Sequence, residues 1–85
     1  MNKKNYISLA KKSADIQINE LKKIIELDNQ NSKAFDLIGS ELDNLNLTEE
    51  AKDRYLDSIY LDPDNSNPYY NLGNNLIMSG KLFLH

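Results

Sequence analysis

The sequence predicts an all-α fold built from antiparallel helix-turn-helix repeats, and three observations support this class. The stretch LDPDNSNPYYNLG, residues 61–73, echoes LDNQNSKAFDLIG, residues 27–39, at an offset of 34 residues. Apolar residues recur at spacings of three and four, which is the period of one helix face. No alternation of apolar and polar residues is long enough to indicate a β-strand.

The 34-residue offset falls on positions that a repeated architecture would use. Identical residues occupy both positions of the pairs Ile25/Ile59, Leu27/Leu61, Asp28/Asp62, Asn31/Asn65, Ser32/Ser66, Gly39/Gly73 and Leu42/Leu76. The pairs Phe35/Tyr69 and Ile38/Leu72 are conservative matches. Because these are apolar and turn positions, chance repetition of a frequent asparagine does not explain them. The period therefore indicates a repeated supersecondary unit.

Residues 5–27 contain no glycine or proline, and they predict either one long helix or two. We favour a single helix whose apolar stripe is interrupted by Gln17. That stripe consists of Tyr6, Leu9, Ser13, Leu21, Ile24 and Ile25. In the alternative, the helix breaks near Lys11 and Lys12, and Ser13 caps the second part.

A second helix is predicted to begin near Lys33, after a cap at Asn31 or Ser32. Its apolar stripe consists of Phe35, Ile38, Leu42 and Leu45. The stretch NLNL, residues 44–47, is predicted to end it.

Two more helices follow in the prediction. Thr48 is expected to cap the third helix, which stops at Asp62 because a residue before proline is pushed out of the α region. Asn67 is expected to cap the fourth helix, with Pro68 at its first position, where a missing N–H costs nothing. The Ser-Gly pair at 79–80 is expected to end it.

Composition excludes several kinds of site. There is no cysteine, and the single histidine is the last residue, His85, so the usual zinc sets and a Ser-His-Asp triad are absent. The i,i+4 pair Asp53/Asp57 is typical of a solvated helix surface. We therefore expect no enzyme activity, no metal and no cofactor.

Charge and hydropathy argue against two classes of partner, nucleic acids and membranes. Thirteen acidic and ten basic residues are interspersed and give a net charge of −3, which argues against a nucleic-acid partner. No apolar run approaches the roughly 18 residues of a membrane span, and the N-terminus lacks a secretory h-region. We expect a cytoplasmic protein that has no membrane partner.

Residues 32–65 resemble one tetratricopeptide repeat, a 34-residue helix-turn-helix unit. The residues that match the pattern of this repeat are Ile38-Gly39 for its Leu-Gly pair, Ala51, Tyr55 and the closing Pro63. Three positions carry a replacement: Phe35 stands for the usual tryptophan, Leu42 for tyrosine and Ser58 for a small alanine. Gly39 and Ala51 lack bulk, so the large Phe35 and Tyr55 are expected to interlock around them.

The resemblance covers the rest of the chain unevenly. Residues 15–31 resemble the second helix of a degenerate preceding repeat, with Gln17 in place of alanine and Asn29 in place of proline. Residues 66–80 resemble the first helix of a further repeat, and residues 81–85 form a tail. The resemblance implies a single domain over residues 1–85, a short right-handed solenoid of the tetratricopeptide type.

The resemblance also implies function: such solenoids are non-catalytic scaffolds that bind a peptide or protein segment on the concave face of their first helices. Carried over by position, this face consists of Lys33, Asp36, Ser40, Asp43, Asn44, Asn67, Tyr70, Asn74, Ile77 and Met78.

Self-association is a further expectation, because the apolar residues of the last helix have no following helix to cover them. The residues expected to take part are Leu72, Leu76, Ile77, Leu82, Phe83 and Leu84. We expect a homo-oligomer, and a two-fold dimer in preference to other states. The alternatives are that the chain is the opening piece of a longer solenoid, or that it is a nucleic-acid-binding helical protein.

Overall fold

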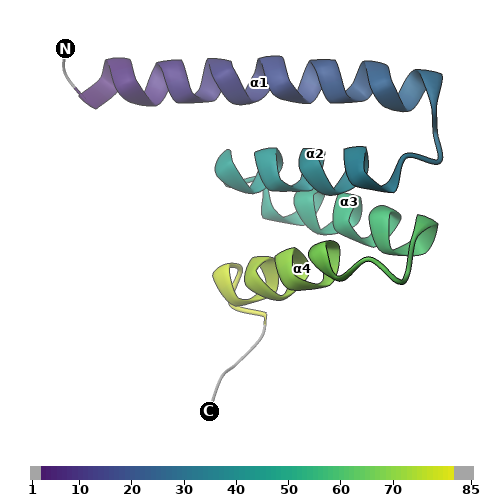
Figure 1. The fold of residues 1–85 in the computed structure, drawn as a ribbon. Helices are drawn as coiled ribbons and strands as arrows, with labels where there is room; N and C mark the ends of the chain where they lie inside the picture. Colours follow the sequence, from purple (N-terminus) through teal and green to yellow (C-terminus); the bar gives the residue numbers. More distant parts are fainter. Residues whose placement is uncertain (1–2, 82–85) are drawn as a thin grey trace.

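The computed structural model describes the backbone of residues 3–81 and the side chains of residues 9–81, and within them the chain forms four α-helices and no strand (Figure 1). The helices are α1 (Lys3–Leu27), α2 (Ser32–Asn44), α3 (Thr48–Leu61) and α4 (Ser66–Met78). The predicted all-helical class is confirmed. The favoured single N-terminal helix is also confirmed, because α1 runs without a break through Lys11 and Lys12.

The chain reverses direction at each connection, so neighbouring helices are antiparallel (Figure 1). Each helix packs against the next one along the chain, and α4 also reaches back to touch α2. The result is a flat molecule with extents of 44 × 43 × 16 Å. At 1.5 Å per residue, the 25-residue α1 is about 37 Å long and projects past the 13-residue α2.

The core lies where α2 meets α1 and α3. It consists of Ile18, Ile38, Leu42, Ala51 and Tyr55, with Leu21, Ile25, Leu45 and Leu72 packed against it. Tyr55 is 2% exposed and Ala51 is fully buried. Burial of these side chains is the main source of stability in a fold without disulfides.

The packed face of α1 differs from the predicted stripe. Ala14 and Ile18 are buried, and together with Leu21 and Ile25 they form a stripe at spacings of four, three and four. Of the predicted stripe, Leu9, Ser13 and Ile24 are exposed, and the side chain of Tyr6 lies outside the described part. The prediction was right for Leu21 and Ile25. It was wrong for Leu9, Ser13 and Ile24, because it passed over the small Ala14 and chose residues that are rotated about the helix axis from the packed side.

The expected close approach of α2 and α3 at Gly39 is present. A Cβ atom added to Gly39 would lie 2.5 Å from Cε1 and 2.7 Å from Cδ1 of Tyr55. The ring of Tyr55 therefore occupies the space that a side chain at position 39 would need. Glycine is required here for lack of bulk, because the residue sits inside a regular helix.

Most helix ends match the prediction. The Asn31 side chain accepts a hydrogen bond from the Ala34 N–H at 3.1 Å, as expected for an N-cap. The helix α3 ends at Leu61, directly before the Asp62-Pro63 pair. The helix α4 ends at Met78, two residues before Gly80, whose φ of 73° is favoured by glycine.

Two predicted caps are wrong. Thr48 is the first residue of α3, and Leu47 precedes it without a side-chain cap, because the α2–α3 turn closes tightly through Asn46 at φ 63°. The helix α4 starts at Ser66, earlier than expected, because the Asn65 side chain accepts from the Asn67 N–H at 3.1 Å. Pro68 then falls in the first turn, where its missing N–H is tolerated.

Candidate functional site

Two amide–carboxylate hydrogen bonds join α2 to α4, and we call them the polar ladder. Asn71 Nδ2 donates to Asp36 Oδ1 at 2.9 Å, and Asn75 Nδ2 donates to Asp43 Oδ1 at 2.7 Å. Asn75 is 1% exposed and also donates to the Thr48 carbonyl oxygen at 2.9 Å. Because buried polar groups without partners are costly, the polar ladder fixes the register of α4 on α2 and α3.

The core tyrosine belongs to the same network. The Tyr55 hydroxyl donates to Asp43 Oδ2 at 2.7 Å, so both oxygens of this carboxylate accept a hydrogen bond. Burial, followed by the hydrogen bond to Asp43 and the negative charges of Asp43 and Asp36, raises the pKa of Tyr55 well above its usual range. The phenol therefore stays protonated and serves as a structural donor.

Two rows of side chains flank the polar ladder on the side opposite to α3, and we call them the α2/α4 surface. Helical spacings of three and four place each row on one side of its helix. The surface consists of Lys33, Leu37, Ser40 and Asn44 from α2 and Asn67, Tyr70, Asn74 and Met78 from α4. Tyr70 is 72% exposed, Met78 60% and Leu37 42%.

The structure places the predicted concave-face residues in three environments. Lys33, Asn44, Asn67, Tyr70, Asn74 and Met78 are exposed on the α2/α4 surface, and Ser40 is half-buried there. Asp36 and Asp43 are engaged in the polar ladder, so we leave them out of the surface. Ile77 is exposed two turns after Tyr70 and therefore lies on the same side of α4 as Tyr70.

Leu37, Asn71 and Asn75 were not among the residues predicted from the sequence. Leu37 lies four positions after Lys33 and three before Ser40, and this helical spacing could have placed it on the same side of α2. Asn71 gave no such signal, because its role depends on a partner 35 residues away.

The α2/α4 surface suits hydrogen bonding and apolar contact in preference to charge recognition. The helix α4 contains no charged residue, and Lys33 is the only charged member of the surface. The amides of Asn44, Asn67 and Asn74 can both donate to and accept from a polypeptide backbone. In the part of the chain that the structure describes, no three His, Asp or Glu side chains form a group that could hold a metal ion.

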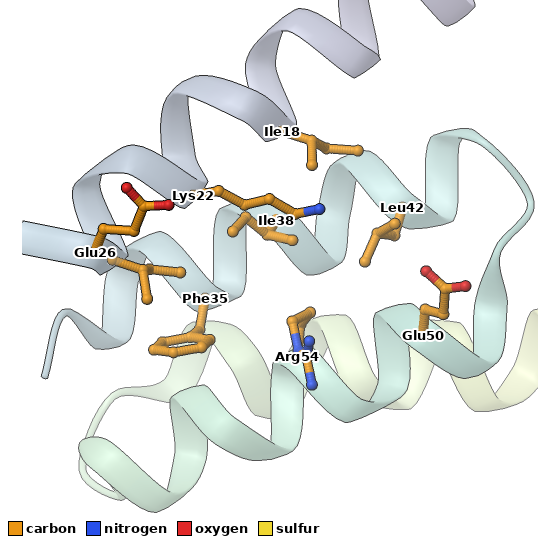
Figure 2. A pocket seen from close by; sticks show the side chains of 9 residues that line it. Ile18, Lys22, Glu26, Phe35, Ile38, Leu42, Glu50 and Arg54 are labelled. Atoms are coloured by element: carbon orange, nitrogen blue, oxygen red, sulfur yellow. The ribbon is translucent and has the colours of Figure 1, made fainter. Parts of the chain in front are cut away.

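A second surface feature is a groove of about 320 Å³ between α1 and α3, with α2 as its floor (Figure 2). Its charged rim consists of Lys22 and Glu26 from α1 and of Glu50 and Arg54 from α3, and its apolar lining consists of Ile18, Ile25, Phe35, Ile38 and Leu42. Arg54 Nη2 pairs with Asp57 Oδ2 at 3.0 Å, whereas its buried Nε has no partner among the described residues.

The floor of the groove offers little exposed apolar area. Its floor residues Ile38 and Leu42 are only 2% and 8% exposed, because they already belong to the core. An occupant would gain little by covering them, since the gain scales with the apolar area removed from water. The α2/α4 surface, with its exposed Tyr70 and Met78, is therefore the better candidate for binding.

The residues expected to self-associate divide between core and surface. Leu72 packs against the core cluster, Leu76 is half-buried and Ile77 is 41% exposed. Leu82, Phe83 and Leu84 lie outside the described residues.

Comparison with known proteins assigns this chain to no family. A scan against models of protein families finds no match for the chain, and a search of curated proteins finds no significant relative. Among the described residues, no helix is both long enough and apolar enough to cross a membrane. The fold and the surface thus define the class only as an all-helical protein with an exposed face of amides and apolar side chains.

Proposed function

We propose that this protein is a non-catalytic interaction scaffold of the tetratricopeptide type that binds an extended polypeptide segment on the α2/α4 surface. In this assignment α2 and α3 form one repeat, α1 is the second helix of a preceding unit, and α4 is the first helix of a following one. Two observations support it. The 34-residue period places Gly39 and Gly73 on the first helix of successive units, and α4 lies against both α2 and α3.

The observation that carries the proposal is the exposure of Tyr70 and Met78 between amide side chains on a rigid base. An exposed tyrosine supplies a large contact area at a small cost in conformational entropy, which is why tyrosine is frequent at binding surfaces. The neighbouring Asn67 and Asn74 can hydrogen-bond the backbone of a segment laid across α4. The polar ladder holds α2 and α4 in register, so the surface is formed before a ligand arrives.

The chemistry of the surface indicates the kind of segment. Since Lys33 is its only charged member, a strongly acidic or basic segment finds little electrostatic complement. We infer an extended segment with neutral polar and apolar side chains, whose apolar residues pack on Leu37, Tyr70 and Met78.

A displayed library of random peptides tests this proposal when it is selected on the full chain. Selected peptides are then labelled, and their dissociation constants are measured by fluorescence anisotropy against two variants. Tyr70→Ala should weaken binding by about tenfold or more, as expected for loss of an aromatic anchor. Tyr60→Ala is the matched control, because Tyr60 is 87% exposed on α3, outside the surface, and should leave binding unchanged.

Two results would contradict the proposal. One is a library that yields no binding peptide. The other is an equal loss of affinity in the Tyr70→Ala and Tyr60→Ala variants, since the peptide would then bind nonspecifically to exposed aromatic side chains.

A further inference from the structure

One side of α4 is open among the described residues, and we call it the α4 end face. It consists of Tyr69, Gly73 and Leu76, whose spacings of four and three place them on one side of the helix. Tyr69 is 48% exposed and Leu76 is half-buried. A Cβ atom added to Gly73 would meet nothing within 4 Å in the described part of the chain.

The chain contains a covered counterpart of this face 34 residues earlier. Phe35, Gly39 and Leu42 of α2 correspond to Tyr69, Gly73 and Leu76 of α4. On α2, the ring of Tyr55 from the antiparallel α3 covers the glycine, with Cε1 only 2.5 Å from the place of a Cβ atom. The counterpart shows what fits such a face: an antiparallel helix that carries an aromatic ring over the glycine.

The helix α4 itself supplies both halves of this contact. Tyr69 lies one turn before Gly73 on the same face. When two copies of α4 run antiparallel with their end faces in contact and cross at the level of residue 71 along the helix, Tyr69 of each copy lies opposite Gly73 of the other. The same pair of residues then forms two equivalent contacts, which is the defining property of a two-fold interface.

Charge also favours a second copy. The stretch SNPYYNLGNNLIM of α4 contains no charged residue, so two copies of α4 meet without like-charge repulsion. Each of the other three helices carries both acidic and basic residues. An antiparallel arrangement also opposes the two helix dipoles favourably.

We propose that the α4 end face is a homodimer interface in which the ring of Tyr69 seats on the partner's Gly73, and reciprocally. The α4 end face shares no residue with the α2/α4 surface, so each dimer presents two polypeptide-binding surfaces. A bivalent scaffold binds a repeated or clustered target more tightly than one copy does. The dimer does not depend on peptide binding, and the two proposals can fail independently.

Sedimentation equilibrium of the full chain tests the interface. A contact between two short helices lies at the small end of the range for specific interfaces, so we expect a dimer with a micromolar dissociation constant. Gly73→Leu fills the space over the glycine that the partner's ring would occupy, and Tyr69→Ala removes that ring. Each substitution should weaken dimerisation by about tenfold or more. Tyr60→Ala is the control and should dimerise like the wild type.

A mixing experiment provides the sharper test. In a mixed dimer, Tyr69 of the Gly73→Leu chain meets an intact glycine, and the new leucine meets the alanine of the Tyr69→Ala chain. The mixture should therefore form dimers where neither variant does alone. Far-UV circular dichroism checks that each variant is folded, as expected from the open space at Gly73.

Three results would overturn the inference. The first is a wild-type chain that is monomeric at about 100 µM, a concentration well above a micromolar dissociation constant. The second is a Gly73→Leu variant that dimerises as tightly as the wild type. The third is a mixture of the two variants that stays monomeric, because dimerisation would then use another surface.

Discussion

Gly39→Ala is the substitution whose effect follows most directly from the packing of α2 on α3. The added methyl group would lie 2.5 Å from Cε1 of Tyr55, whereas carbon atoms in contact are normally about 3.5 Å apart. The ring must therefore move by roughly 1 Å. Its hydroxyl is held by Asp43 at 2.7 Å and the residue is 2% exposed, so the ring has no free space to enter.

Overpacking of this kind destabilises a core by ~1–3 kcal/mol. Alanine is the better helix former by about 1 kcal/mol, which offsets part of that penalty. Gly73→Ala is the matched control, because it makes the same change at the equivalent position of α4, where nothing lies within 4 Å among the described residues. We expect Gly39→Ala to lower the free energy of unfolding and Gly73→Ala to raise it.

Urea unfolding followed by far-UV circular dichroism measures both variants, at a protein concentration below that of dimerisation. For a domain of this size, each 1 kcal/mol corresponds to a shift of about 4–8 °C in Tm, so thermal melts provide a second reading. Equal shifts of the two variants in the same direction would contradict the packing of Tyr55 on Gly39, because the two glycines would then have the same surroundings.

Three further predictions concern the buried polar contacts. Asn75→Ala should lower the free energy of unfolding by ~1–3 kcal/mol in urea titrations, since it leaves Asp43 with an unmet hydrogen bond, and no change would mean that the polar ladder is not formed. The raised pKa of Tyr55 gives a stability that is complete below pH of about 10 and declines above it, as the unfolded chain loses a proton that the folded chain keeps. Tyr55→Phe should remove this alkaline decline, and a parallel decline in both proteins would assign it to other groups. Ser58→Ala should cost about 1 kcal/mol in the same titrations, because the hydroxyl donates to the Ser32 carbonyl oxygen at 2.8 Å, and an unchanged midpoint would contradict this.

The helix boundaries could be predicted from the sequence because their signals are local. Asn31 caps α2 through the N–H three residues later, and Asp62-Pro63 ends α3 through the restriction that proline places on its neighbour. The cap at Thr48 failed because the tight turn at Asn46 moved the start of α3 by one residue.

The polar ladder was beyond sequence reasoning for a physical reason. Asp36 and Asp43 look like solvated charges on an exposed helix, and nothing near them in the sequence signals otherwise. Their partners Asn71 and Asn75 are 35 and 32 residues away, so the pairing exists only after α4 has folded back onto α2. The resemblance to the tetratricopeptide repeat supplied most residues of the α2/α4 surface, but it did not separate the side chains that hold the helices together from those that are exposed.

The binding of polypeptide segments to the α2/α4 surface can be tested by nuclear magnetic resonance. The isotope-labelled full chain is titrated with a selected peptide. We expect the largest amide shifts within residues 33–44 of α2 and residues 67–78 of α4, together with shifts of the side-chain amides of Asn67 and Asn74. Shifts concentrated along Lys22, Glu26 and Arg54, at the rim of the groove between α1 and α3, would contradict it.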